Sequence, residues 1–249
     1  MNPIIVSMIM FTCVFGGALL GMFLSPKLPE HHLSNDSRQI VNLAMGIIGT
    51  MAALVLGLLV ASAKNSFDTR NNELIEVSAK VAMLDRVLAH YGPESKDARD
   101  QLRETVSNMI ERLWPKSQVG PFVPRQTGGE RVYDTIEEFS PSNETQKSQK
   151  EEALGLAMSL GQTRWLMFAQ ADTAISSTLL VLLIFWFTIN FVSLGLFAPR
   201  NATVTAALFL CALAVSGAIL LILEMYKPFS GLIQISDAPL RDVLAQLGR

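Results

Sequence analysis

Four stretches of this chain contain no charged residue over a length that can cross a membrane. They cover residues 4–24, 40–63, 173–198 and 202–223. An α-helix rises about 1.5 Å per residue, so roughly 20 apolar residues span the hydrocarbon core of a bilayer, which is about 30 Å thick. The stretches lack the apolar–polar alternation of barrel strands. They therefore predict four transmembrane helices.

The charged residues are concentrated between the second and third of these stretches. Of the 20 Lys and Arg residues, 14 lie between Lys64 and Asp172, and 17 of the 22 Asp and Glu residues lie in the same segment. Two solvents, lipid and water, explain this segregation. We expect an all-α integral membrane protein with a helical domain inserted between spans 2 and 3. The predicted boundaries are 1–63 for spans 1 and 2, 64–172 for the domain, 173–225 for spans 3 and 4, and 226–249 for a C-terminal segment.

An even number of spans places both termini and the inserted domain on one side of the membrane. Five basic residues lie near the membrane on that side, against three on the side of the short loops, which favours a cytoplasmic domain and cytoplasmic termini. The five are Lys64, Arg70, Arg164, Lys227 and Arg241, and the three are Lys27, Arg38 and Arg200. Both cysteines, Cys13 and Cys211, lie inside apolar stretches, where we expect small packing residues rather than a disulfide.

A heptad-like apolar stripe follows the second span, from Phe67 to Tyr91, with Arg70 interrupting it. Nothing breaks the helical pattern after Ile40, so the span and the stripe are expected to form one long helix. Gly92 fits the residue that ends this helix, and the chain continues with helices predicted near residues 98–113 and 148–170. The stripe packs either within the chain or between subunits. Arg70 slightly favours the second, since polar residues in such a seam often fix the choice of partner.

One face of the second span carries small and weakly polar residues. They are Asn42, Gly46, Gly49, Thr50, Ala53, Gly57 and Ala61. Such a face allows close packing of helices, or it forms a narrow pore wall in an oligomer. Four charged residues near the inner ends of the spans would surround the mouth of that pore: Lys64, Asp172, Glu224 and Lys227.

Several other classes of protein are disfavoured by the sequence. No Asp, Glu, Lys, Arg, His or Pro lies inside the four stretches, whereas coupled transporters usually carry charged groups or broken helices in the membrane. A net charge of −2 argues against a nucleic-acid-binding protein. The three histidines, His31, His32 and His90, have no nucleophile, phosphate loop or metal-ligand spacing around them. We therefore expect neither an enzyme nor a bound metal or cofactor.

Four segments together resemble one family. They are LPEHHLS at 28–34, ALVLGLLVASAKNSFDTRNNE at 53–73, LDRVLAHYGPESKDAR at 84–99 and LEMYKPFSGLIQIS at 223–236. They are similar to the bacterial bestrophin-like membrane proteins, distant relatives of the bestrophin channels. The resemblance implies an ion channel of the bacterial inner membrane, with four spans per subunit and the second span lining a central pore. Its implied partners are the lipid bilayer, further copies of the chain, most simply in a pentamer, and the permeating ions.

The resemblance does not extend to every feature of bestrophins. Eukaryotic members carry an acidic calcium-binding clasp after a Pro-Phe pair, but here Pro228 and Phe229 are followed by SGLIQIS. Calcium gating is therefore not implied. Glu224 either pairs with a base such as Lys64 or Lys227, or belongs to a charged ring. Ion selectivity stays open, and so does an alternative function as a non-conducting scaffold or signalling protein that acts through its cytoplasmic helices.

Overall fold

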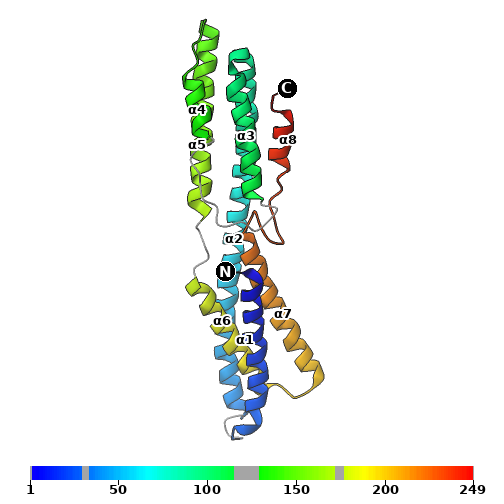
Figure 1. The fold of residues 1–249 in the computed structure, drawn as a ribbon. Helices are drawn as coiled ribbons and strands as arrows, with labels where there is room; N and C mark the ends of the chain where they lie inside the picture. Colours follow the sequence, from blue (N-terminus) through cyan, green and yellow to red (C-terminus); the bar gives the residue numbers. More distant parts are fainter. Residues whose placement is uncertain (1, 30–33, 115–128, 172–176, 249) are drawn as a thin grey trace. The chain divides into compact units, whose positions relative to one another are not determined.

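A computed structural model describes residues 2–29, 34–114, 129–171 and 177–248 of the chain. The described residues form helices joined by turns, which confirms the predicted all-α class. The helices are α1 (Pro3–Leu24), η1 (Ser25–Lys27), α2 (Asn35–Tyr91), η3 (Pro93–Ser95), α3 (Lys96–Leu113), α4 (Gly129–Glu137), α5 (Glu144–Ala171), α6 (Ser177–Phe197), α7 (Ala202–Met225) and α8 (Ala238–Gln246) (Figure 1).

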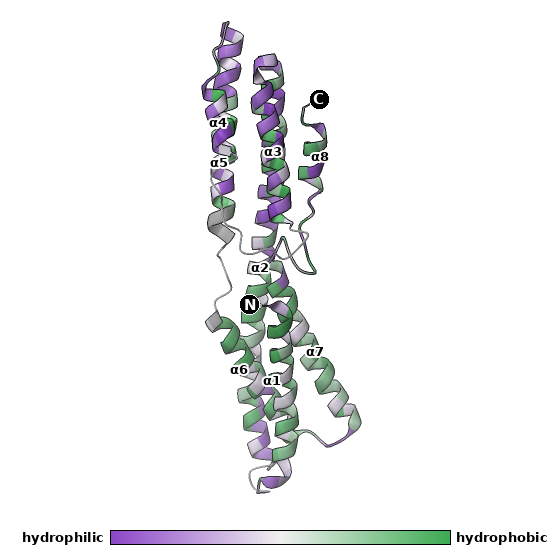
Figure 2. Cartoon of the chain, viewed as in Figure 1, coloured by the Kyte–Doolittle hydropathy of each residue, from purple (hydrophilic) through white to green (hydrophobic). Residues whose placement is uncertain are grey.

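Four helices are long and apolar enough to cross a membrane, as predicted: α1, α2, α6 and α7. Figure 2 shows that α1, α6, α7 and the first half of α2 are largely hydrophobic, whereas α3, α4 and α5 are largely hydrophilic. The helix α2 runs without interruption for 57 residues, which confirms that the second span and the stripe after it form one helix.

The chain divides into two compact units. The first, here called the apolar unit, contains Met1–Phe67 and Ala174–Lys227. The second, the polar unit, contains Asp68–Thr173 and Pro228–Arg249. The two segments of each unit are distant in sequence, so each unit is assembled by tertiary contacts rather than by local chain folding.

The apolar unit is held together by a close contact between α1 and α6. A Cβ atom added to Gly21 would lie 2.1 Å from the Val192 carbonyl oxygen, and one added to Gly195 would lie 2.0 Å from the Ala18 oxygen. Without side chains at these two positions, the backbones touch directly, as in other membrane helix pairs with small residues at their interface. The signal for this contact, GGALLG at 16–21, is present in the sequence, but our prediction considered close packing only for the second span.

Larger side chains fill the remainder of the apolar unit. Met10 and Val14 of α1 are fully buried, as are Leu183 of α6 and Ala212 of α7. An aromatic cluster joins α1 to α7, where the rings of Phe11 and Phe15 each meet Phe209 edge-on at a centroid distance of 5.4 Å. Van der Waals packing of this kind is one of the forces that hold membrane helices together, since lipid is as apolar as the side chains and the hydrophobic effect does not drive their association.

The apolar stripe of α2 is buried inside the polar unit. Leu74, Val77, Val81, Leu84, Leu88 and Tyr91 are all less than 5% exposed. Arg70 is only 6% exposed within its own chain. The preference for packing between subunits, which rested on Arg70, is therefore wrong, because the seam already has partners in the same polypeptide. The face of α3 formed by Ala98, Leu102, Val106 and Ile110 is buried in the same unit.

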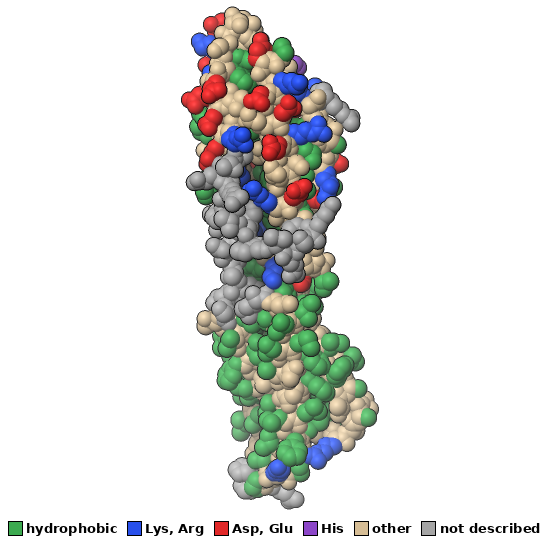
Figure 3. Space-filling view, in the orientation of Figure 1, with side chains coloured by type: hydrophobic (Ala, Val, Ile, Leu, Met, Phe, Trp, Pro, Cys, Tyr) green, Lys and Arg blue, Asp and Glu red, His purple; other side chains and the backbone are tan. Residues whose placement is uncertain are grey.

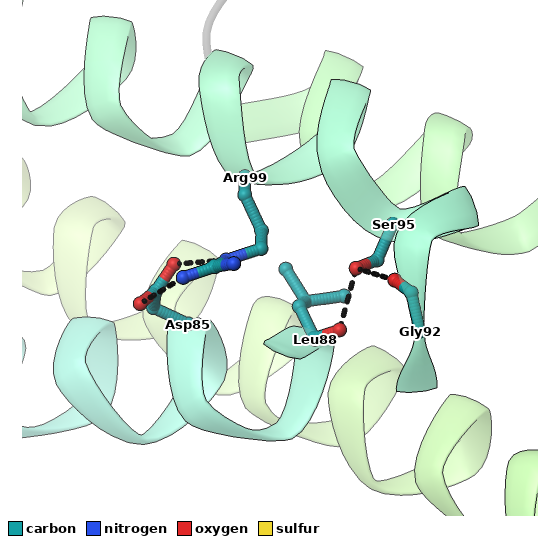
Figure 4. A network of polar contacts seen from close by, with 5 residues as sticks. All are labelled: Asp85, Leu88, Gly92, Ser95 and Arg99. Carbon is teal, nitrogen blue, oxygen red and sulfur yellow. Dashed lines mark hydrogen bonds and ion pairs between the residues drawn. The ribbon is translucent and has the colours of Figure 1, made fainter. Parts of the chain in front are cut away.

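The turn between α2 and α3 is built as the sequence predicted. Gly92 has φ +126°, a backbone conformation that residues with a Cβ rarely adopt. The Ser95 hydroxyl lies 2.5 Å from the Leu88 carbonyl oxygen and 2.7 Å from that of Gly92, so it caps the end of α2 (Figure 4). Asp85 accepts two hydrogen bonds from Arg99, at 2.7 and 3.0 Å. This hydrogen bonding raises the pKa of the Arg99 guanidinium above its ordinary value.

Two helices of the polar unit were not predicted. The helix α4 buries Val132 and Ile136. At its C-terminal end, the Lys150 ammonium group donates to the carbonyl oxygens of Glu137 and Phe139, at 2.7 and 2.8 Å. The helix α8 buries Leu240. Both have only nine residues. The predicted loop before α4 lies largely outside the described residues.

The segment after α7 is attached to the end of α3 by Trp114. The indole N–H of Trp114 donates to the Ile235 carbonyl oxygen at 2.9 Å, and its ring meets the Phe229 ring edge-on at 5.3 Å. The amide of Ile235 in turn donates to the Pro228 carbonyl oxygen at 2.7 Å. These contacts fold Pro228–Ile235 into a compact turn, in agreement with the turn predicted from Pro228 and Gly231.

Candidate functional site

The membrane-spanning part of α2 has three distinct faces, and one of them packs on the apolar unit. Ala52, Leu59 and Ala63 are buried in the core of that unit, with Val55 and Leu56 partly buried beside them. A polar contact also joins α2 to the end of α7, where the Ser62 hydroxyl lies 3.2 Å from the Tyr226 hydroxyl. This face positions α2 and leaves its other two faces available.

The predicted small face is the second one, and most of it is uncovered. Its exposed members are Asn42, Gly46, Thr50, Ala53, Gly57 and Ala61. No atom lies within 4 Å of where a Cβ would stand on Gly46 or Gly57. The exception is Gly49, whose Cβ position is 3.6 Å from the Asn190 side-chain oxygen of α6. Close packing within the chain therefore accounts for Gly49 but not for the rest of this face.

The third face is a ridge of large apolar side chains that our sequence reasoning did not single out. Its members are Ile40, Leu43, Ile47, Met51, Leu54 and Leu58, which are between 51% and 72% exposed. Their spacing of three and four residues is visible in the sequence, but all spans look apolar on every side. Only the structure separates a ridge that faces outward from the side chains that face the core.

Asn190 and Ser193 are polar side chains of α6 within the apolar unit. The Asn190 amide nitrogen donates weakly to the Trp186 carbonyl oxygen at 3.5 Å, and its oxygen approaches Gly49 of α2. The Ser193 hydroxyl is buried and has no hydrogen-bond partner among the described residues. Polar groups inside a membrane usually mark close helix contacts or a path for water and ions. Asn190 places one such group at the edge of the small face.

The predicted inner-mouth charges have different environments. Lys64 and Lys227 are exposed, whereas Glu224, in the last turn of α7, is 4% exposed. Asp172 lies outside the described residues. A carboxylate as buried as Glu224 needs compensating polar contacts to remain in place. That these four residues surround one mouth stays a prediction.

No group of three His, Cys, Asp or Glu residues in the described part of the chain could hold a metal ion. His90 is exposed in the last turn of α2, and His31 and His32 lie outside the described residues.

Comparison with known proteins identifies the family. The family profile of the bestrophin-like domain matches residues 12–240. No curated protein and no solved structure matches the chain. The profile match extends from the middle of α1 to the start of α8, so it covers the later part of α1, the whole of α2, α6 and α7, and most of both units. This chain is a membrane protein that belongs to the bestrophin-like family.

Proposed function

We propose that this protein is a homo-oligomeric ion channel of the bacterial inner membrane, with α2 lining the conduction path. The main support is the uncovered state of α2, since among the described residues two of its three membrane faces are largely exposed. Membership of the bestrophin-like family supports the same function. The polar unit and both termini lie in the cytoplasm in this proposal, and a pentamer is the favoured assembly.

Several copies around an axis would use both uncovered faces of α2. One face turns toward the axis, and the other meets a neighbouring copy or lipid. We favour the small face as the wall of the path, because Asn42 and Thr50 bring polar atoms and the open positions at Gly46 and Gly57 leave room for water. A wall of six large apolar side chains in every copy would dewet and oppose ion passage.

The first test is ion flux through the purified protein in liposomes, under separate gradients of chloride, sodium and potassium. Gly57→Leu fills the open small face and should abolish the flux. Gly16→Leu is the matched control, since Gly16 of α1 is equally open, with no atom within 4 Å of its Cβ position. Lys64→Glu should shift the selectivity toward cations if Lys64 stands at the mouth. Both Gly variants must keep the oligomeric state of the native protein.

A second test separates the two uncovered faces. In a Cys13→Ser, Cys211→Ser background, Gly57→Cys and Leu58→Cys place a thiol on neighbouring faces of the same turn. A charged, water-soluble thiol reagent should block flux through Gly57→Cys and spare Leu58→Cys. The opposite result would place the ridge at the axis and the small face between subunits.

The alternative, a non-conducting scaffold or signalling protein, has one structural observation in its favour. Ile75 and Met83, on the part of α2 in the polar unit, are 48% and 55% exposed to water. Exposed large apolar residues in a water-soluble unit often mark protein contacts. Absence of flux under every gradient, pH and membrane tension, together with a stoichiometric partner from native membranes, would favour this function over the channel.

A further inference from the structure

Three basic side chains lie at the end of the apolar unit where its helices are joined by short loops. Lys27 belongs to η1, Arg38 to the first turns of α2, and Arg200 to the connection between α6 and α7. Figure 3 shows Lys and Arg side chains at this end of the hydrophobic surface.

Each of the three cations is held at the end of an apolar helix. The Lys27 ammonium nitrogen stands 4.0 Å from the centroid of the Phe23 ring, and the Arg38 guanidinium carbon stands 6.0 Å from that of Phe197. Cations attract the faces of aromatic rings within about 6 Å. Arg200 donates a hydrogen bond of 2.5 Å to the Met22 carbonyl oxygen. The three positions are therefore set by contacts with the last turns of α1 and α6.

These contacts leave most of the hydrogen-bonding capacity of the cations unused. A guanidinium group has five N–H donors and an ammonium group has three. Arg200 donates one hydrogen bond to Met22. The aromatic rings beside Lys27 and Arg38 accept no conventional hydrogen bond from these cations. Among the described charged residues of this end, Asp36 is the one carboxylate, so the cations outnumber it three to one. Glu30 adds a second carboxylate from the part of the loop outside the described residues.

The surface next to the cations is apolar and exposed. On α1, just before Lys27, Leu19, Leu20 and Phe23 are all more than two-fifths exposed. A phosphate group bound by the cations would thus stand directly above a surface that accepts hydrocarbon chains. Phosphate oxygens are preferred partners of Arg and Lys, and basic residues at the membrane surface attract anionic lipids.

We infer that this end of the apolar unit binds an anionic phospholipid, with its phosphate between Lys27, Arg38 and Arg200 and its acyl chains along α1. A free phosphate is the less suitable ligand, because it would leave the adjoining apolar surface unused. The inference does not depend on the channel proposal, since lipid binding is measured without ion flux.

The test is lipid retention by the full-length protein, measured by native mass spectrometry after purification in detergent. The probes are phosphatidylglycerol, which is anionic, and phosphatidylcholine, which has no net charge, both with the same acyl chains. We expect a preference for phosphatidylglycerol that falls roughly fivefold for each cation removed. The variants are Lys27→Gln with Arg38→Gln, which leaves the Arg200–Met22 bond intact, and the triple variant that adds Arg200→Gln.

A matched control removes three exposed basic residues of the polar unit, with Arg86→Gln, Lys96→Gln and Arg112→Gln. This control should keep the native preference for phosphatidylglycerol. Equal retention of both lipids by the native protein would overturn the inference, as would an unchanged preference in both variants. Thermal stabilisation by millimolar glycerol 3-phosphate equal to that by phosphatidylglycerol would also overturn it, because a soluble phosphate would then suffice.

Discussion

Replacing Gly21 with alanine inserts a methyl group into the contact between α1 and α6. The new Cβ would stand 2.1 Å from the Val192 carbonyl oxygen and 2.8 Å from the Leu196 amide nitrogen. Real Cβ atoms essentially never approach closer than 3.0 Å, so the helices must separate. Because the obstructing atoms belong to the backbone, no side-chain rotation can relieve the overlap.

The loss of stability caused by Gly21→Ala can be compared with the effect of a control substitution on the same helix. Overpacking of this kind typically destabilises by about 1–3 kcal/mol. Gly16→Ala, which meets no atom within 4 Å, should be neutral or stabilising by up to about 1 kcal/mol, since alanine favours a helix more than glycine does. Gly21→Ala gains the same helix propensity, so the difference between the two variants isolates the clash, at roughly 1–3 kcal/mol.

The assay is unfolding of the purified protein in mild detergent, followed by tryptophan fluorescence against temperature or added denaturing detergent. Gly21→Ala should unfold at a lower midpoint than Gly16→Ala, with the native protein between them or level with the control. Adding Gly195→Ala to Gly21→Ala should cost less than the two separate losses combined, because one separation of α1 from α6 relieves both overlaps. Equal stability of Gly21→Ala and Gly16→Ala would refute the close backbone contact.

Three predictions concern the polar unit. Asp85→Ala and Arg99→Ala should each lower the free energy of unfolding by about 1–3 kcal/mol, because each variant leaves a partly buried charge without its partner. The double variant should therefore lose less stability than the two single variants combined. Additive losses would contradict a direct pair. Gly92→Ala should lower the free energy of unfolding by about 1–2 kcal/mol, because alanine rarely adopts the φ of +126° found at this position. An unchanged midpoint would show that the turn accepts a Cβ without strain. Trp114→Phe should lose only the hydrogen bond to Ile235, which is worth about 1 kcal/mol. Trp114→Ala also removes the ring contact, so it should expose the segment after α7 to proteases. Equal resistance of the two variants to proteolysis would show that the ring does not hold that segment.

The sequence alone determined the features that depend on the order of residues along one helix. Uncharged stretches of membrane length identified α1, α2, α6 and α7, because lipid forces every backbone polar group into a helix and excludes charged side chains. The unbroken pattern from Ile40 to Tyr91 predicted one long helix, and Gly92 with Pro93 predicted where it ends. The nine-residue helices α4 and α8 were missed because each buries so few side chains that its pattern resembles a polar loop.

Only the tertiary structure decided which face of each helix meets which neighbour. In a membrane span every face is apolar, so hydrophobic periodicity does not distinguish the core from the lipid. The sequence could therefore list the small face of α2, but it did not show that Gly46 and Gly57 are open while Gly21 and Gly195 touch backbone. In the polar unit the stripe of α2 was clear, yet only the structure showed that the stripe and Arg70 are buried within the same chain. Side-chain patterns fix local conformation, whereas partners are fixed by contacts between residues far apart in the sequence.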